Sequence, residues 1–271
     1  MKVPTDLGLR GAVAIVTGGA RGVGLGITRT LLAAEAEVVV CGRTAPAGPV
    51  EHAGRTAEFM PCDVRDPAAV LDLVQAVVAR HGTVDVLVNN AGGSPYAPAA
   101  QASSRFHAKI VELNLLAPLL VAQAANEVMQ DRGGAIVMVS SVSGHRPSPG
   151  TAAYGAAKAG LDNLTASLAI EWAPKVRVNS VAVGMVRTEQ AHLHYGDEDG
   201  IEAVGRTVPL GRLAEPDEIG QCVAFLASPL ASYVSGATLL VHGGGERPAF
   251  LDAANAGAGA SARSAQTEAI E

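Results

Sequence analysis

The sequence predicts an α/β fold in which parallel strands alternate with helices, and three observations predict it. Short apolar runs rich in valine and isoleucine, typical of buried strands, recur at residues 12–17, 37–41, 57–64, 84–90, 135–140, 176–183 and 237–241. Stretches of about 12 to 15 residues with helical spacing separate most of these runs, as in βαβ units. The distinctive glycine, acidic and amide residues follow the runs, and parallel sheets bind ligands at the carboxyl ends of their strands.

Helices are expected over residues 22–34, 66–81, 103–130, 151–172 and 215–227. Asp66 precedes Pro67, and both residue types favour a helix start at these positions. Asn114 is a poor residue for a helix interior and suggests a kink or a polar task there. The polar segment 185–206 joins a strand to a helix over an unusual length, and long loops beside ligand sites are often lids.

Composition limits the class of protein. The 271 residues allow one α/β domain, and 48% hydrophobic but only 3% aromatic residues predict a core of aliphatic side chains. A formal net charge of −6 argues against a nucleic-acid or anionic-membrane partner. The three cysteines, an odd number, fit buried thiols in a reducing cytosol better than disulfides or zinc. We therefore expect a cytoplasmic protein without a metal site.

A glycine-rich turn follows the first strand and opens the first helix. Over residues 18–24 it reads Gly-Gly-Ala-Arg-Gly-Val-Gly. Glycines let backbone amides and the helix N-terminus approach a pyrophosphate, so this turn predicts a cradle for a dinucleotide. Glycine turns alone are weak signals, because many are only tight turns. The candidate cofactor-binding residues here are Gly18, Arg21, Gly22, Val23 and Gly24.

The end of the second strand bears on the choice of dinucleotide. An NAD site normally carries an acidic residue there for the ribose hydroxyls, but this chain has Gly42 followed by Arg43. An acid would repel a 2′-phosphate, whereas an arginine attracts one, and Arg21 lies in the glycine turn. We therefore predict NADP as the preferred cofactor. If both arginines are ordinary surface charges, NAD remains the alternative.

Tyr154 and Lys158 are the candidate acid/base pair. They stand four apart in a predicted helix, so both side chains project from one face. A phenol has a pKa of about 10, and a nearby ammonium favours the phenolate and is expected to lower that pKa. Ser141 ends the preceding strand, where a hydroxyl could donate to a substrate oxygen. The alternative is an ordinary amphipathic tyrosine beside a solvated lysine.

Taken together, these motifs resemble the short-chain dehydrogenase/reductase family over residues 8–245. The similarity is carried, in this order, by the glycine turn after Thr17 and by Asp63, Asn89-Asn-Ala-Gly92, Asn114, Ser141 and Tyr154-Gly-Ala-Ala-Lys158. The resemblance implies a single Rossmann-type doubly wound domain with a seven-stranded parallel sheet flanked by helices. That domain would span residues 8–247, and the Ala-, Gly- and Ser-rich residues 248–271 would form a tail too poor in apolar side chains to order itself.

The resemblance also implies roles for the matching residues. Tyr154 would protonate a carbonyl oxygen, Lys158 would lower the Tyr154 pKa and hold the nicotinamide ribose, and Ser141 would bind the substrate oxygen. Asn114 would anchor a water in a proton relay to Lys158. Further cofactor contacts would come from Arg43, Asp63, Val64, Asn90, Ala91, Gly92, Gly184, Val186 and Thr188.

Two positions depart from the family pattern. Val183 stands where the family usually has a proline before Gly184, so the cofactor-facing loop is expected to be less rigid. His242 stands where an aspartate usually precedes two glycines, which bears on contacts between subunits. The four catalytic positions are intact, which argues against an inactive relative.

We expect an NADPH-preferring reductase that converts a carbonyl, a 3-oxoacyl group or another hydrophobic ketone, to an alcohol. An NAD-dependent alcohol or hydroxysteroid dehydrogenase is the alternative if Arg43 points into solvent. A dinucleotide-binding scaffold or sensor without turnover is disfavoured, because Tyr154 and Lys158 are both present. The family usually forms tetramers, so the expected protein partners are copies of this chain, in a homotetramer or homodimer.

Overall fold

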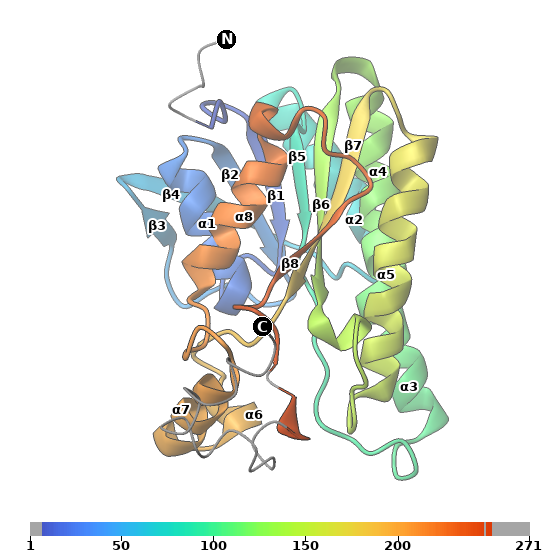
Figure 1. The fold of residues 1–271 in the computed structure, drawn as a ribbon. Coiled ribbons are helices and arrows are strands. Elements are labelled where there is room, and N and C mark those ends of the chain that lie inside the picture. Colours follow the sequence, from blue (N-terminus) through green and yellow to red (C-terminus); the bar gives the residue numbers. More distant parts are fainter. Residues whose placement is uncertain (1–6, 247, 251–271) are drawn as a thin grey trace, which may run out of the picture.

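The computed structural model describes residues 7–246 and 248–250, which form one twisted sheet with helices on both faces (Figure 1). The strand order is β3-β4-β2-β1-β5-β6-β7-β8. All neighbouring pairs from β4 to β8 are parallel, and their order steps outward in both directions from the β1–β5 pair. This is the predicted doubly wound arrangement, in which the carboxyl ends of the central strands leave a crevice for a ligand.

The strands match the predicted apolar runs, with one addition. They are β1 (Val13–Thr17), β2 (Glu37–Gly42), β3 (Val50–His52), β4 (Arg55–Pro61), β5 (Val86–Asn89), β6 (Gly134–Ser141), β7 (Val176–Val183) and β8 (Thr238–Val241). The sheet therefore has eight strands rather than the predicted seven. The extra strand, β3, pairs antiparallel with β4 through a two-residue turn in which Ala53 and Gly54 both have positive φ. Three residues are too few for a detectable apolar pattern.

The helices also lie close to their predicted ranges. They are α1 (Gly22–Ala33), α2 (Pro67–His81), α3 (Ser104–Val111), α4 (Ala117–Arg132), α5 (Ala152–Glu171) and α8 (Pro216–Ala227). A π-helical segment, η1 (Glu112–Leu116), interrupts the long helix at Asn114, where the sequence predicts a kink or a polar task. By length and composition the run Ser104–Arg132 could cross a membrane, but in this fold it packs within the domain against α2 and α5.

The segment 185–206, expected as a long loop, contains two short helices. These are α6 (His192–Tyr195) and α7 (Glu198–Thr207). Asp197 caps α7 by accepting a hydrogen bond from the Gly200 amide at 3.1 Å. Ile201 packs with Ala191 and Leu213 in a small apolar cluster of its own. A cap and a few buried side chains therefore order a stretch whose overall polarity suggests a loop.

Two apolar layers lie on opposite faces of the sheet. Leu31 of α1 and Val223 of α8 pack on the face that contains Val16, whereas α2, α4 and α5 cover the face that contains Ile15. The alternation of β1 residues between the two layers follows from the two-residue repeat of a strand. Residues 251–271, most of the predicted tail, lie outside the described residues.

Candidate active site

The predicted acid/base residues meet where β6 ends and α5 begins. Ser141 is the last residue of β6, and its hydroxyl accepts a hydrogen bond from the Ser143 amide at 3.2 Å. Tyr154 lies in the first turn of α5, half-buried, and the Ser141 hydroxyl is near enough to lower the pKa of its phenol. A strand end and a helix start thus bring together two hydroxyls that are 13 positions apart in the chain.

Lys158 lies one helical turn after Tyr154 and is buried, with 3% of its surface exposed. Its Nζ donates to the Val139 carbonyl at 2.7 Å and lies 5.6 Å from the centroid of the Tyr154 ring. Burial lowers the pKa of Lys158 to about 8, because an ammonium loses its hydration there, and the Asp162 charge opposes this effect. Lys158 is therefore poised to change charge near neutral pH.

The pKa of Tyr154 differs from the expectation. Burial raises this pKa above its usual value, because a buried phenolate is poorly solvated, and the hydrogen bond from Ser141 only partly opposes the rise. The predicted fall in the pKa of Tyr154 follows from the charge of Lys158 alone, because the sequence does not show that the phenol is buried. Because its pKa is raised, Tyr154 is protonated at neutral pH, and release of its proton depends on the positive charge of Lys158, which stabilises the phenolate.

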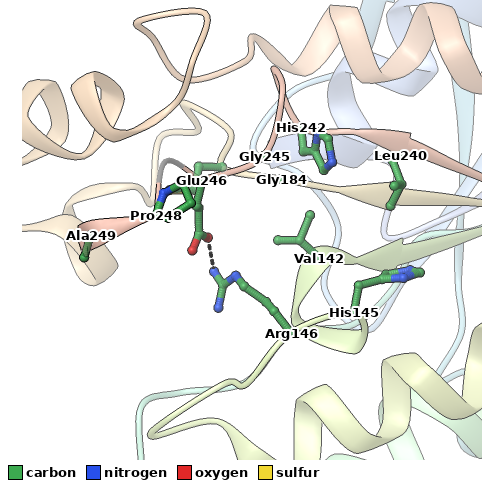
Figure 2. Close-up of a pocket in the computed structure, with 11 residues that line it drawn as sticks. Val142, His145, Arg146, Gly184, Leu240, His242, Gly245, Glu246, Pro248 and Ala249 are labelled. Atoms are coloured by element: carbon green, nitrogen blue, oxygen red, sulfur yellow. Dashed lines mark ion pairs between the residues drawn. The ribbon is translucent and has the colours of Figure 1, made fainter. Parts of the chain in front are cut away.

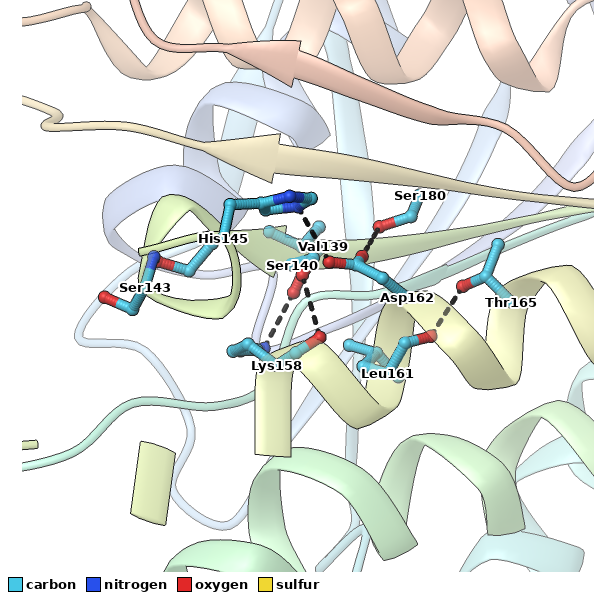
Figure 3. A network of polar contacts seen from close by, with 10 residues as sticks. Val139, Ser140, Ser143, His145, Lys158, Leu161, Asp162, Thr165 and Ser180 are labelled. Atoms are coloured by element: carbon cyan, nitrogen blue, oxygen red, sulfur yellow. Dashed lines mark hydrogen bonds and ion pairs between the residues drawn. The ribbon is translucent and has the colours of Figure 1, made fainter. Parts of the chain in front are cut away.

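Asp162 links Lys158 to two other elements (Figure 3). Its Oδ1 accepts a hydrogen bond from the Ser180 hydroxyl of β7 at 2.7 Å, and its Oδ2 lies 2.9 Å from His145 Nε2. Asp162 follows Lys158 by four positions, the spacing that places two helical side chains on one face. The sequence analysis missed Asp162, although that spacing was a signal that could have found it.

Asn114 is fully buried in η1, and its side chain is held by backbone groups. Its Nδ2 donates to the carbonyls of Gly93 and Ile110, and its Oδ1 accepts from the Gly93 amide at 2.8 Å. A Cβ atom at Gly92 would lie 2.7 Å from Asn114 Oδ1 and 3.5 Å from Lys158 Nζ. Asn114 thus fixes the loop after β5 close to Lys158. The water relay through Asn114 stays a prediction.

The glycine turn is packed too tightly for side chains at two of its positions. A Cβ at Gly24 would lie 2.2 Å from the Gly18 carbonyl oxygen, and a Cβ at Gly19 would lie 2.6 Å from the Val40 side chain. Asn90 holds this turn, since its Nδ2 donates to the carbonyls of Thr17 and Gly18 at 2.9 and 3.2 Å. Thr17, which the sequence analysis did not propose as a site residue, accepts from the amides of Asn90 and Ala91 through its hydroxyl.

The N-terminus of α1 binds a carboxylate of the same chain. The Gly22 amide donates to both carboxylate oxygens of Glu189, at 3.0 and 3.2 Å. The first amides of a helix lack partners within the helix and favour negative charge. Together with the close backbone packing at Gly24, this contact fits the turn to the pyrophosphate of a dinucleotide.

Charged residues gather where β2 and β4 end. Asp63 forms two side-chain hydrogen bonds with Arg65, at 2.9 and 2.6 Å, and Arg65 lowers the pKa of Asp63 to about 2. Arg43, predicted to recognise a 2′-phosphate, is exposed and close enough to contribute to the same lowering. Val64 is buried beside them. Arg65 is a further candidate that the sequence analysis missed.

The loop after β7 carries the remaining predicted cofactor residues. Gly184 follows the strand, and a Cβ there would lie 2.8 Å from His242, the residue that departs from the family pattern. Val186 forms a bridge with Ala214, which anchors the base of the segment 185–206. Thr188 lies against the glycine turn, since a Cβ at Gly22 would be 3.7 Å from its methyl group.

A cavity of about 510 Å³ opens beside this site (Figure 2). Its lining begins at Val142, next to Ser141, and includes apolar Met185 and Leu240 together with His145. Arg146 and Glu246 form an ion pair across it at 2.5 Å. Tyr154 and Lys158 are not in the lining, so the cavity lies beside the acid/base pair and does not contain it. Its volume could hold the body of a substrate.

Tyr195 of α6 connects the cavity with the acid/base pair. Burial raises the pKa of Tyr195, and the charges of Arg146 and Glu246 act on it in opposite directions. Tyr195 in turn adds to the rise in the pKa of Tyr154. The segment 185–206 therefore contributes a phenol to the site, which the sequence analysis did not propose.

Comparisons with known proteins place the chain in a family. The family model described as enoyl-(acyl carrier protein) reductase matches residues 18–246. The 3-oxoacyl-acyl-carrier-protein reductase of Vibrio cholerae is 37% identical over 243 residues, which cover 88% of this chain and 98% of that protein. The chain belongs to the short-chain dehydrogenase/reductase family. It is accordingly an NAD(P)-dependent oxidoreductase.

Two solved structures and one longer relative support the same family assignment. The ligand-free aldohexose dehydrogenase of Thermoplasma acidophilum superimposes with a TM-score of 0.82 and 30% identity, covering 87% of this chain and 94% of that one. A variant actinorhodin polyketide ketoreductase with NADPH gives a TM-score of 0.81 and 35% identity, covering 86% and 97%. An uncharacterized short-chain type dehydrogenase/reductase of Sinorhizobium fredii is 39% identical over 240 residues, which are 86% of this chain but 43% of that protein.

Asp162→Asn is expected to move the alkaline limb of the pH–rate profile to lower pH. The Asp162 charge supports the protonated form of Lys158, whose pKa is about 8, so its removal leaves less Lys158 charged at pH 8. We expect turnover at pH 8 to fall by roughly 3- to 10-fold, with a smaller loss at pH 6. Steady-state rates between pH 6 and 9 measure this. Ser180→Ala, which removes a hydrogen bond but no charge, should leave the limb in place; an equal shift in both variants would contradict the electrostatic role.

Proposed function

We propose that this protein is an NADPH-preferring reductase that converts a hydrophobic ketone, such as a 3-oxoacyl group, to an alcohol. The observation that carries the proposal is that Tyr154 lies near Ser141 and one helical turn from Lys158, whose Nζ is 5.6 Å from the centroid of the Tyr154 ring. A protonated phenol beside a positive charge can give a proton to an oxygen that gains negative charge. That is the requirement of carbonyl reduction.

In this mechanism the cofactor, when bound, supplies the hydride. The Ser141 hydroxyl orients the substrate oxygen, and the Tyr154 phenol gives its proton to that oxygen. Lys158 stabilises the resulting phenolate through its positive charge. Asp162 helps to keep that charge on Lys158. The glycine turn and Asn90 hold the dinucleotide in place without taking part in proton transfer.

The preference for NADPH rests on the charges at the ends of β2 and β4. The second strand ends in Gly42 rather than an acid, and Arg43 beside it is exposed. The nearby acid, Asp63, is paired with Arg65, which reduces its repulsion of a phosphate. A similar protein, the actinorhodin ketoreductase, has a solved structure with NADPH.

Arg43→Ala is expected to weaken NADPH binding by about 10-fold and to leave NADH binding within about 2-fold. An arginine–phosphate contact is charge-assisted, and only NADPH carries the 2′-phosphate. Fluorescence titration of each dinucleotide measures both affinities. Arg10→Ala, which removes an exposed arginine paired with Glu35, is the matched control. An equal loss for both dinucleotides, or tighter binding of NADH by the wild type, would turn the proposal towards the NAD-dependent alternative.

The substrate class is tested by NADPH oxidation with 3-oxoacyl thioesters and bulky ketones, and by NAD reduction with aldoses. The largely apolar lining near Met185 and Leu240 supports a hydrophobic substrate, and the similarity to a 3-oxoacyl reductase supports the same choice. The similarity to an aldohexose dehydrogenase favours the alternative, alcohol oxidation with NAD. Turnover of aldoses with NAD but not of ketones with NADPH would select that alternative. Binding without any turnover would favour a sensor or scaffold.

We also propose that the protein assembles with copies of itself in the cytoplasm. Ile170 of α5 is 81% exposed, and Leu240 on the edge strand β8 is about half exposed, so apolar surface is available on two elements. Light scattering coupled to gel filtration measures the assembly. A monomer at micromolar concentration would contradict it.

A further inference from the structure

The carboxylate of Glu189 occupies the N-terminus of α1. Both of its oxygens lie within hydrogen-bond distance of the Gly22 amide, at 3.0 and 3.2 Å. Gly22 is the first residue of α1, so its amide is one of those that the helix itself leaves without a partner. The two residues are 167 positions apart in the chain, and the contact therefore depends on the fold rather than on a local turn.

The segment that carries Glu189 is held against the glycine turn. The Arg187 amide donates to the Ala214 carbonyl at 2.8 Å, and the Ala214 amide donates to the Met185 carbonyl at 3.0 Å. These bonds fix the chain just before Glu189, and Thr188 packs beside Gly22. The Arg187 side chain pairs with Glu198, which begins α7. The position of Glu189 is thus tied to the base of the segment 185–206 and to α7.

The same amide is where the pyrophosphate of a dinucleotide is expected. A carboxylate and a phosphate oxygen cannot both accept the bond from one Gly22 N–H, and two negative groups at one helix end repel each other. Binding of the cofactor therefore requires Glu189 to leave. Because Glu189 is joined to the base of the segment 185–206, its departure also frees that segment to move.

We propose that Glu189 is a resident anion in the phosphate cradle, which competes with the dinucleotide and holds the segment 185–206 against the glycine turn until the cofactor displaces it. Glu189 is then a determinant of cofactor affinity that acts on both NADPH and NADH, since both carry the pyrophosphate. The inference rests on the family's nicotinamide dinucleotide and is independent of the 2′-phosphate and of the substrate. If Glu189 instead bound a hydroxyl of the cofactor, its removal would weaken cofactor binding rather than strengthen it.

Glu189→Gln tests this inference through affinity. The variant keeps the size of the side chain but loses its charge, so we expect the Kd for NADPH and for NADH to fall by about 3- to 10-fold. Glu202→Gln is the matched control, because Glu202 is an exposed acid of the same segment that pairs with Arg206 rather than with the glycine turn or with Arg187. Its Kd values should match those of the wild type. Unchanged or weaker binding by Glu189→Gln would overturn the inference.

A second measurement needs no cofactor. Hydrogen exchange of the cofactor-free proteins should show faster exchange at residues 185–190 in Glu189→Gln than in the wild type, because the contact with α1 is weakened. The same exchange rate in both proteins would show that Glu189 does not hold the segment 185–206 and would overturn that part of the inference.

If the wild type and the variant bind neither dinucleotide, the cofactor assignment fails together with the inference. Equal binding by both proteins would instead overturn the inference alone.

Discussion

Replacing Tyr154 with phenylalanine is expected to lower kcat by about 10²- to 10⁴-fold while leaving the dinucleotide Kd within about 3-fold. The substitution removes one hydroxyl, the group that lies near Ser141 and that would give its proton to the substrate. Steady-state kinetics with NADPH and an accepted ketone, together with a fluorescence titration, separate the two effects.

Tyr233→Phe is the control for this experiment. Tyr233 is fully exposed, so its hydroxyl is expected to matter neither for turnover nor for binding. Circular dichroism and melting temperature should be the same for all three proteins, because each substitution removes one hydroxyl and keeps the aromatic ring. Full turnover by Tyr154→Phe would exclude the phenol as the proton donor. Loss of both turnover and folding would require the same test with Ser141→Ala, which removes the partner hydroxyl instead.

Much of this arrangement could be predicted because it follows from local patterns. Seven apolar runs became parallel strands, and Ser141, Tyr154 and Lys158 came together because a strand end and the next helix start meet at one edge of the sheet. A glycine turn between a strand and a helix is a typical phosphate cradle, and both neighbours are visible in the sequence. In these cases the sequence neighbours of a residue determine its place.

The features that escaped prediction depend on contacts between distant segments. Asp162 gains its role from Ser180 on β7 and His145 on the loop after β6, and Glu189 meets Gly22 only once the sheet is complete. The rise in the pKa of Tyr154 comes from burial, which no spacing reveals. The strand β3 was missed for a different reason, because three residues carry no measurable period.

Two parts of the site are expected to affect cofactor binding in different ways. The glycine turn and Asn90 form a rigid cradle, since their backbone groups are bonded to one another and have no room to adjust. Glu189 and the segment 185–206 form the adjustable part, attached through the bridge between Val186 and Ala214. Changes in the rigid part are therefore expected to abolish binding, whereas changes in the adjustable part should tune it.

Gly24→Ala is the sharpest test of the rigid part. The added methyl group would lie 2.2 Å from the Gly18 carbonyl oxygen and 2.5 Å from Asn90 Nδ2, closer than atoms can pack. The turn must then move, which displaces the Gly22 amide and breaks the bonds from Asn90 that hold the cradle. We expect NADPH and NADH affinity to fall by at least about 100-fold, and stability to fall by about 1–3 kcal/mol, the usual result of overpacking.

Gly48→Ala provides the comparison, because a methyl group there meets nothing within 4 Å. That variant should bind both dinucleotides like the wild type and melt at the same or a slightly higher temperature, since alanine restricts the unfolded chain. For Gly24→Ala we expect the melting temperature to fall by roughly 2–12 °C, at about 2–4 °C per kcal/mol for a domain of this size. A Gly24→Ala protein that binds NADPH normally would mean that the turn is mobile, and the pyrophosphate would then have to be held elsewhere.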